Sequence, residues 1–285
     1  MTIDSNAGPR LRVHWAGRSV VGCVRTNNED ALWAGSLAEA GTPGEIPDDT
    51  EGEGTLDRPG AVLAVADGMG GAKAGEVASA LAVTVLGHEM LSRGKAVDDG
   101  DTEALAQTFV RAVEVANERI REESAVNPAR RGMGTTLTAV WVYDHVAQIV
   151  HVGDSRAYLF RKGRLARMTK DQSLVEKLLE DNIITEEEAQ RMGARNIILQ
   201  ALGSEEDLEV AQPRGEVQAG DLLVLCTDGL TGVVPDDEVE EILRAGGSLQ
   251  DTCDRLITAA EEAGGPDNIT VLVGRIEPAH SAPSS

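Results

Sequence analysis

The sequence predicts an α+β fold built on antiparallel sheet. Two segments with apolar residues at helical spacing, 75–91 and 103–124, follow one another along the chain. A run of short β-rich segments then occupies 135–169, joined by the turn sequences Asp-His, Gly-Asp-Ser and Lys-Gly. Strands in runs and helices in pairs favour this class over a doubly wound fold, which alternates single strands with single helices.

The length and composition of the chain indicate an aliphatic core. Its 285 residues are enough to bury a sizeable core in one large domain or two small ones. Aromatic residues make up only 2% of the sequence, so the 41% that is hydrophobic consists mainly of aliphatic residues and alanine. We therefore expect a core of Val, Leu, Ile and Ala.

The charge of the chain limits its partners. A formal charge of −22 arises from 48 acidic and 26 basic residues, with no basic cluster, so nucleic acid and membrane surfaces are not expected as partners. No apolar run has membrane-spanning length, and residues 1–19 lack the apolar core of a secretory signal. Cys23, Cys226 and Cys253 lack C-x-x-C spacing, which argues against a disulfide framework or a zinc site. We expect a cytoplasmic monomer with no membrane segment.

Two strands are predicted before the first helix. One lies near 19–23, and a second, buried on both faces, covers the apolar run 62–66. Between them, the stretch 35–60 contains seven acidic residues and one arginine, together with several Gly and Pro residues. This composition predicts a mobile acidic loop.

The second half of the chain returns to helical periodicity over 171–193. There Thr185 and Glu188 form a capping box that begins a second short helix. The remaining elements are a strand ending in Asp-Gly, two amphipathic helices ending in glycine, and a closing strand, at 221–229, 235–247, 249–265 and 268–277.

Four aspartates lie at predicted strand ends. Asp67, Asp154 and Asp228 each follow an apolar run and adjoin a glycine, and Asp267 stands just before the closing strand. An isolated Asp-Gly pair is commonly only a turn, but strand ends that converge would bring these carboxylates together. Two like charges about 4 Å apart cost roughly 4 kcal/mol at an effective dielectric constant of about 20. A cation is therefore needed to neutralise the cluster.

A divalent metal is the simplest cation for this cluster, because the flanking sequences bring almost no Lys or Arg. Ligation by carboxylates and backbone carbonyls suits Mg²⁺, Mn²⁺ or Ca²⁺, whereas the lack of clustered His and Cys argues against zinc. Gly68 has no Cβ, so it can turn sharply and present its carbonyl to the same ion.

Arg25 lies in the stretch GCVRTNNED, close to two further carboxylates, Glu29 and Asp30. Its forked guanidinium suits a phosphate group, although a surface salt bridge is an equally simple interpretation. Two neighbouring divalent metals can activate a bridging water and stabilise the attacking and leaving oxygens of a phosphoryl transfer. The pattern therefore indicates phosphate-ester chemistry.

Seven motifs follow one another along the chain: RTNNEDA, VLAVADGMGG with GEVAS, GMGTTLTAV, VHVGDSRAYLFRKGRLARMTKDQS, RNIILQALG, GDLLVLCTDGLTGVV and GGPDNITVLV. Together they resemble the metal-dependent serine/threonine protein phosphatases of the PPM or type 2C family, in its bacterial form. The resemblance implies one catalytic domain over 11–277 with flexible tails at 1–10 and 278–285. It also implies a sandwich of two antiparallel sheets flanked on both sides by helix pairs, in α-β-β-α layers.

The resemblance implies a site for two Mn²⁺ or Mg²⁺ ions. It assigns Asp67 as the ligand that bridges both ions and the carbonyl of Gly68 as a further ligand. Asp228 and Asp267 would complete the shell of one ion.

Other residues are assigned by the same resemblance to the second ion and to the substrate. Asp30 and Glu29 would contact the second ion directly or through water. Asp154 would join Asp228 in holding a third, weaker metal. Arg25 would bind the substrate phosphate.

The reaction implied is hydrolysis of phosphoserine and phosphothreonine by a water that bridges two metals. Its substrates would be phosphorylated proteins, including Ser/Thr protein kinases and the proteins that they modify. The segment 171–196 would be the variable flap of the family. Met69 replaces a histidine that some members carry as a proposed general acid, so the leaving group must be protonated by another group. The catalytic residues expected are Arg25, Asp67, Asp228 and Asp267.

Two alternatives stay open. One is a narrower regulatory enzyme of the same fold that dephosphorylates an anti-sigma-antagonist type of protein. The other is a pseudophosphatase that binds metal and docks a partner without catalysis. A pseudophosphatase would lack a metal ligand, and none of the expected ligands is missing from the sequence.

Overall fold

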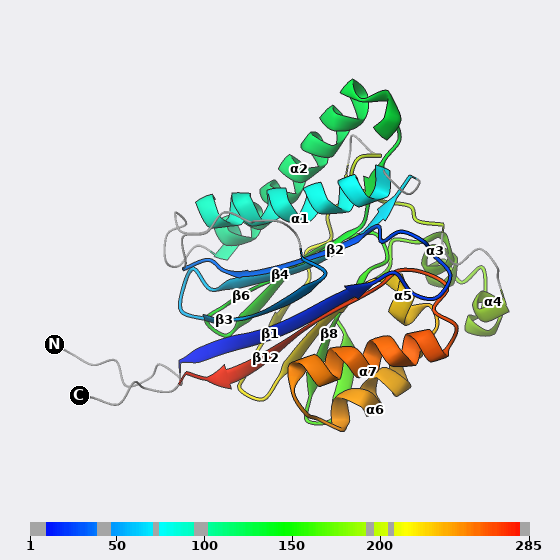
Figure 1. Ribbon diagram of the computed structural model, residues 1–285. Helices are drawn as coiled ribbons and strands as arrows, with labels where there is room; N and C mark the ends of the chain where they lie inside the picture. Colours follow the sequence, from blue (N-terminus) through cyan, green and yellow to red (C-terminus); the bar gives the residue numbers. More distant parts are fainter. Residues whose placement is uncertain are drawn as a thin grey trace.

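The protein is a four-layer α-β-β-α sandwich, which confirms the predicted fold class (Figure 1). Helices α1 and α2 cover one sheet, and α6 and α7 cover the other. Figure 1 shows α3, α4 and α5 at the end of the sandwich opposite to the start of β1. The computed structural model describes residues 10–38, 47–70, 74–93, 102–191, 197–204 and 208–279.

The first sheet is antiparallel and joins the two ends of the chain. The first and last strands along the chain, β1 and β12, are neighbours in this sheet, with Leu11 opposite Pro278 and Val20 opposite Ile269. In spatial order, its strands are β3 (Asp49–Thr55), β1 (Leu11–Val20), β12 (Ile269–Pro278), β11 (Leu222–Cys226), β8 (Arg156–Arg161) and β9 (Arg164–Arg167).

The second sheet is also antiparallel and has β4 near its centre. The short strand β5 (Gly134–Thr135) pairs with the end of β4. In spatial order, the other strands are β10 (Arg214–Glu216), β7 (Val146–Val152), β6 (Leu137–Tyr143), β4 (Ala61–Met69) and β2 (Asp30–Ser36).

The helices follow the predicted pairs. The capping box at α4 is confirmed, because Thr185 N donates to Glu188 Oε2 at 2.8 Å and Glu188 N donates to Thr185 Oγ1 at 3.3 Å. Within the described ranges, no helix is long and apolar enough to cross a bilayer. The helices are α1 (Ala74–Arg93), α2 (Thr102–Val126), the 3₁₀ turn Pro128–Arg130, α3 (Leu174–Glu180), α4 (Glu186–Arg191), α5 (Asp228–Thr231), α6 (Asp236–Arg244) and α7 (Leu249–Glu262).

Three apolar layers hold the sandwich together, and β4 contributes to two of them. Leu63 and Val65 are buried between the two sheets. Val62 and Ala64 point the other way and are buried under α1 and α2. The prediction that the run 62–66 is a strand buried on both faces is therefore confirmed. A continuous apolar run is what a strand in this position requires, since successive side chains face opposite layers.

The predicted mobile acidic loop at 35–60 is wrong for part of its length. Asp49–Thr55 is strand β3, which pairs with β1 at the edge of the first sheet. Its acidic side chains face solvent, while Gly52 lies against Trp15, where a Cβ would come within 2.6 Å of Cζ2 of the ring. The segment lacks the apolar and aromatic residues typical of strands, so composition alone suggested a loop. Residues 39–46 lie outside the described residues.

The boundaries predicted at the chain ends are shifted. Strand β1 ends at Val20, so most of the predicted strand 19–23 is a turn. At the other end, Ala279 N donates to the carbonyl of Arg10 at 2.7 Å, which extends the β1–β12 pairing into both predicted tails. The rest of those tails and the last part of the predicted flap lie outside the described residues, at 1–9, 280–285 and 192–196.

We predict that Gly52→Val lowers the free energy of unfolding by about 1–3 kcal/mol, because its Cβ would clash with the buried ring of Trp15. The urea midpoint, at an unchanged slope, measures this loss. Glu51→Val, on the exposed face of the same strand, is the matched control and should stay within about 0.5 kcal/mol of the natural protein. Equal midpoints for the two variants would show that the segment is not packed as a strand.

Candidate active site

Five parts of the chain meet at the end of the sandwich near α5, and each brings one aspartate. Asp67 on β4 lies directly opposite Asp30 on β2 in the antiparallel register. Asp154 follows β7, Asp228 begins α5, and Asp267 precedes β12. The structure therefore brings together the aspartates that the sequence places at strand ends.

Asp67 is at the centre of this group, which we call the aspartate cluster: Asp30, Asp67, Asp154, Asp228 and Asp267. Burial raises the pKa of Asp67 well above its usual range, and the charges of the other four carboxylates raise it further. Several buried like charges oppose folding unless protons or a cation neutralise them. The cluster therefore has the electrostatics of a cation site.

Asp30 is held by two hydroxyl groups from the neighbouring sheet. Thr270 Oγ1 and Thr227 Oγ1 donate to its Oδ2 at 2.7 and 2.8 Å. Burial raises the pKa of Asp30 to about 7 even though these hydrogen bonds lower it. Its Oδ1 is buried and has no hydrogen-bond partner. One oxygen of Asp30 is thus fixed, and the other is left to accept a different ligand.

Asp154 and Asp228 each present one further carboxylate oxygen that lacks a hydrogen-bond partner. Oδ1 of both residues is buried without a hydrogen-bond partner. Burial raises the pKa of Asp154 to about 7 and also raises that of Asp228. Three unpartnered carboxylate oxygens at one site fit a hard divalent cation that accepts oxygen ligands.

The carboxylates of the aspartate cluster lie close together, but they are not arranged around a single point. Among the described residues, no three carboxylate, imidazole or thiolate side chains form a finished metal site. An all-oxygen donor set favours Mg²⁺ or Mn²⁺ over Zn²⁺.

Glycine allows the backbone segments of the site to approach one another closely. Strand β4 continues through Met69, so Gly68 does not turn the chain as the sequence suggested. A Cβ on Gly68 would lie 2.2 Å from the carbonyl oxygen of Gly75, and one on Gly229 would lie 1.8 Å from that of Asn268. A larger residue at either position would force the ligand-bearing segments apart.

Glu29 lies beside the aspartate cluster and has a firmly held backbone. Its N–H donates to Asn268 Oδ1 at 2.8 Å, and its carbonyl accepts from Ser79 Oγ at 2.6 Å. Its carboxylate lies against Gly75, where a Cβ would be 2.0 Å from Oε2. Burial raises the pKa of Glu29, and the charge of Arg25 lowers it. The expected role of Glu29 at the second ion stays a prediction.

Arg25 is ion-paired at the rim of the cluster. Its Nη2 donates to Asp267 Oδ2 at 2.7 Å, and 51% of the Arg25 side chain is exposed. The other oxygen of Asp267 accepts from Asn268 N at 2.9 Å. The salt bridge that was one interpretation of Arg25 is therefore present, and its partner is an expected metal ligand. Its role in phosphate binding stays a prediction.

Sequence reasoning missed the polar side chains that hold the ligands in place. Asn268 Nδ2 donates to the carbonyls of Val21 and Asn27 at 3.0 and 2.9 Å, while its Oδ1 accepts from Glu29 N. Thr270 holds Asp30, as described above. The signal for both was their place in PDNIT, immediately after Asp267. Only the fold shows that they reach across to the segment that carries Glu29 and Asp30.

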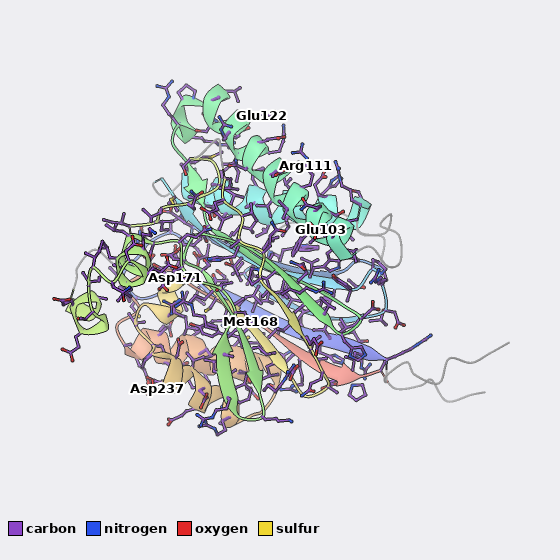
Figure 2. All side chains as sticks on the ribbon, turned by 180° about the vertical axis from the view of Figure 1, so that it is seen from behind. Glu103, Arg111, Glu122, Met168, Asp171 and Asp237 are labelled. Carbon is purple, nitrogen blue, oxygen red and sulfur yellow. The ribbon has the colours of Figure 1, made fainter. Side chains whose placement is uncertain are left out.

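A cavity of about 830 Å³ opens beside the cluster, lined by Asp154 and Asp228 at one end and by α3 and α4 at the other. Between these ends, Arg156 Nη2 and Arg167 Nη2 donate to the two oxygens of Asp171 at 2.7 and 2.6 Å. Figure 2 labels Asp171 close to the yellow-green helices of the predicted flap. These ion pairs attach the start of the flap to β8 and β9.

Comparison with known proteins assigns the family. Residues 44–269 match the sequence profile described as Protein phosphatase 2C. The chain belongs to the protein phosphatase 2C family. The resemblance drawn from the seven sequence motifs is therefore confirmed.

Two relatives within the protein phosphatase 2C family show how far the similarity extends. The serine/threonine protein phosphatase PstP of Mycobacterium tuberculosis is 37% identical over 270 residues, which cover 93% of this chain and 45% of the relative. The serine/threonine phosphatase stp of Listeria monocytogenes is 40% identical over 212 residues, which cover 74% of this chain and 83% of the relative. The chain thus spans less than half the length of the mycobacterial relative.

Solved structures of the same family share the fold. A crystal structure of the Mycobacterium tuberculosis phosphatase PstP aligns with a TM-score of 0.77 and 36% identity, covering 93% of this chain and 99% of that chain. A structure of the PstP catalytic domain in complex with two manganese ions aligns with a TM-score of 0.75 and 36% identity, covering 94% of this chain and 99% of that chain.

We predict that Asp154→Asn raises the melting temperature in EDTA by several degrees near pH 8 and much less near pH 5. Folding raises the pKa of Asp154 from 3.8 to about 7. The ionised side chain therefore opposes folding, and this penalty grows as the pH rises between these two values. The asparagine variant removes the penalty, and a thermal shift assay at both pH values measures the difference.

Glu51→Gln, which removes an exposed charge on β3, is the control for this comparison and should change the melting temperature little at either pH. Mn²⁺ should raise the melting temperature of the natural protein more than that of Asp154→Asn. If Asp154→Asn melts with the natural protein at both pH values, Asp154 is not part of a strained carboxylate cluster.

Proposed function

We propose that this chain is a metal-dependent protein serine/threonine phosphatase. The observation that carries the proposal is the aspartate cluster, in which buried oxygens of Asp30, Asp154 and Asp228 lack hydrogen-bond partners around Asp67. The serine/threonine phosphatases PstP and stp, relatives in the same family, support the activity. The two manganese ions in the PstP structure support the choice of Mn²⁺ or Mg²⁺.

The cluster supplies enough oxygen ligands for the ions that the family resemblance implies. When bound there, the cations supply an activated water and neutralise the oxygens of the phosphoryl group. The residues that would hold two core ions are Asp67, the carbonyl of Gly68, Asp228 and Asp267, with Asp30 and Glu29 toward the second ion and Asp154 with Asp228 toward a third.

Arg25 is the group that would bind the phosphoryl group of the substrate. Its side chain is half exposed at the rim of the cluster. Burial lowers the pKa of Arg25, but the nearby charges of Asp267, Glu29 and Asp67 together raise it above its ordinary value. A planar guanidinium can exchange a carboxylate for two phosphate oxygens at little cost in geometry. Arg25 would thus orient the phosphoryl group while Asp267 is released to a cation.

Met69 and His151, which are close in sequence to expected metal ligands, are not suited to protonate the leaving serine or threonine oxygen. Met69 carries a thioether, which has no proton to donate. The ring of His151 is closed off by Thr138 Oγ1 at 2.8 Å and the carbonyl of Lys170 at 2.9 Å, and burial lowers its pKa to about 4. We infer that the leaving oxygen takes its proton from water at the site.

The proposed substrates are phosphorylated proteins, including Ser/Thr kinases and their targets, as the sequence suggests. We also propose that the protein acts in the cytoplasm as a monomer. The formal charge of −22 supports the exclusion of nucleic acid, since a polyanion would be repelled by an acidic surface.

We predict that phosphate release from a phosphothreonine peptide requires Mn²⁺ or Mg²⁺ and stops in EDTA. Asp228→Ala should lower kcat by at least about 100-fold, because it removes an expected metal ligand. Asp237→Ala, in the first turn of α6 and exposed (Figure 2), is the matched control and should retain full activity. Equal turnover in EDTA and in Mn²⁺ would rule out the proposed function.

We predict that Arg25→Ala lowers kcat/KM for a phosphopeptide by roughly 10–100-fold, mainly through KM, because it removes charge-assisted hydrogen bonds to the phosphate. Arg25→Lys should recover part of this loss, since it keeps the charge but not the fork. Arg119→Ala, which removes an exposed arginine on α2, should leave both constants unchanged. An unchanged KM in Arg25→Ala would exclude Arg25 from phosphate binding.

A further inference from the structure

Large hydrophobic side chains are exposed mainly around the aspartate cluster. Six such side chains are exposed among the described residues, and five of them lie on segments that flank the cluster. Val21 and Val24 precede Arg25, on the side of the cluster that would bind phosphate. The others are on the flap side, at Ile183, Ile197 and Leu199. Apolar groups gathered at one place on a surface mark a contact site for another molecule.

Ile183 is presented by a defined turn between α3 and α4. Its N–H donates to the carbonyl of Leu178 at 2.9 Å, and the preceding Asn182 has a φ of 54°. Ile183 is 64% exposed and lines the 830 Å³ cavity together with Leu179 and Ile184. The flap therefore brings several apolar side chains to the wall of the cavity, and a fixed backbone presents Ile183 among them.

The segment that carries Ile197 and Leu199 is joined to the start of the flap. Leu174 N donates to the carbonyl of Ile197 at 2.9 Å, and Leu199 N donates to that of Gln172 at 2.7 Å. Two exposed apolar side chains thus lie next to α3, which forms part of the cavity wall.

The same cavity is also lined by charged side chains, most of them acidic. Arg156 and Arg167 line the cavity, but both are ion-paired with Asp171. Glu176 and Glu188 also line it. Glu176 lies 3.8 Å from Nη2 of Arg167, whereas hydrogen bonds from Thr185 lower the pKa of Glu188, so the Glu188 side chain stays ionised. A cavity lined by both apolar side chains and carboxylates complements an apolar side chain that has a basic neighbour.

We propose that this cavity, which we call the flap pocket, binds a large apolar side chain of the phosphoprotein substrate, with a Lys or Arg next to it. The inference rests on the proposed function and names the substrates that the site selects. The occupant follows from continuity, because Asp154 and Asp228 line both the flap pocket and the aspartate cluster. A polypeptide whose phosphate reaches the cluster therefore has its neighbouring residues beside the pocket.

The test uses phosphothreonine peptides of one composition, in which a Leu-Arg pair is moved one residue at a time along the peptide. Phosphate release in Mn²⁺ gives kcat/KM for each peptide, and binding of the same fluorescein-labelled peptides is followed by anisotropy. The natural protein should prefer one position of the pair. It should lose that preference when Arg in the pair is replaced by Glu.

Ile183→Ser is the variant that tests the pocket, and Val126→Ser, at the exposed end of α2, is the matched control. Ile183→Ser should lower kcat/KM for the preferred peptide by about tenfold, which is the usual effect of losing one apolar contact to a substrate. It should leave hydrolysis of p-nitrophenyl phosphate unchanged, because this small ester does not reach the pocket. Val126→Ser should match the natural protein on both substrates.

Two results would overturn the inference: a flat profile across the peptide series, or a positional preference that survives in Ile183→Ser. These outcomes differ from a failure of the proposed function. If peptides bind with the expected preference but no substrate is hydrolysed, the flap pocket stands and the phosphatase activity does not. If all peptides are hydrolysed equally, the activity stands and the pocket has no role in selection.

Discussion

The mutual repulsion of five carboxylates at one end of the sandwich is the constraint on which the site depends. Burial and neighbouring charges raise the pKa of Asp67, and the same causes raise those of Asp30 and Asp154 to about 7. Such a group opposes folding at neutral pH unless a cation offsets it. The packed apolar layers elsewhere in the molecule must therefore stabilise the fold enough to hold this unfavourable arrangement together.

The repulsion is controlled by small residues and by neutral hydrogen-bond partners. Gly68 and Gly229 let the ligand-bearing segments approach within distances that no larger residue allows. Thr227 and Thr270 orient Asp30 without adding charge, so one of its oxygens is fixed and the other is left unpartnered. Neutral donors leave the negative charge of the cluster in place, whereas Lys or Arg in these positions would cancel the attraction for a divalent cation.

The aspartate cluster and the flap pocket lie side by side at the same end of the sandwich. Asp171 anchors the start of the flap to the first sheet through Arg156 and Arg167. The flap is therefore attached to the strand that follows Asp154, and its position is coupled to that of an expected ligand. Phosphate recognition at the cluster and side-chain recognition at the flap pocket would then act on one substrate chain. The aspartate cluster would bind the phosphoryl group that all substrates share, and the flap pocket would bind the neighbouring side chains in which the substrates differ.

The sequence by itself determined the fold class, the family and the aspartates of the cluster. Each of these depends on residue type and local spacing: apolar runs that end in Asp-Gly, helical periodicity, and motifs in order. Only the tertiary structure decided that Asp49–Thr55 is an edge strand, because that depends on pairing with β1 and on the fit of Gly52 to Trp15. Packing between distant segments likewise left oxygens such as Asp30 Oδ1 without partners, and it formed the cavity beside the flap. Local sequence cannot determine such contacts, because they join residues that are far apart along the chain.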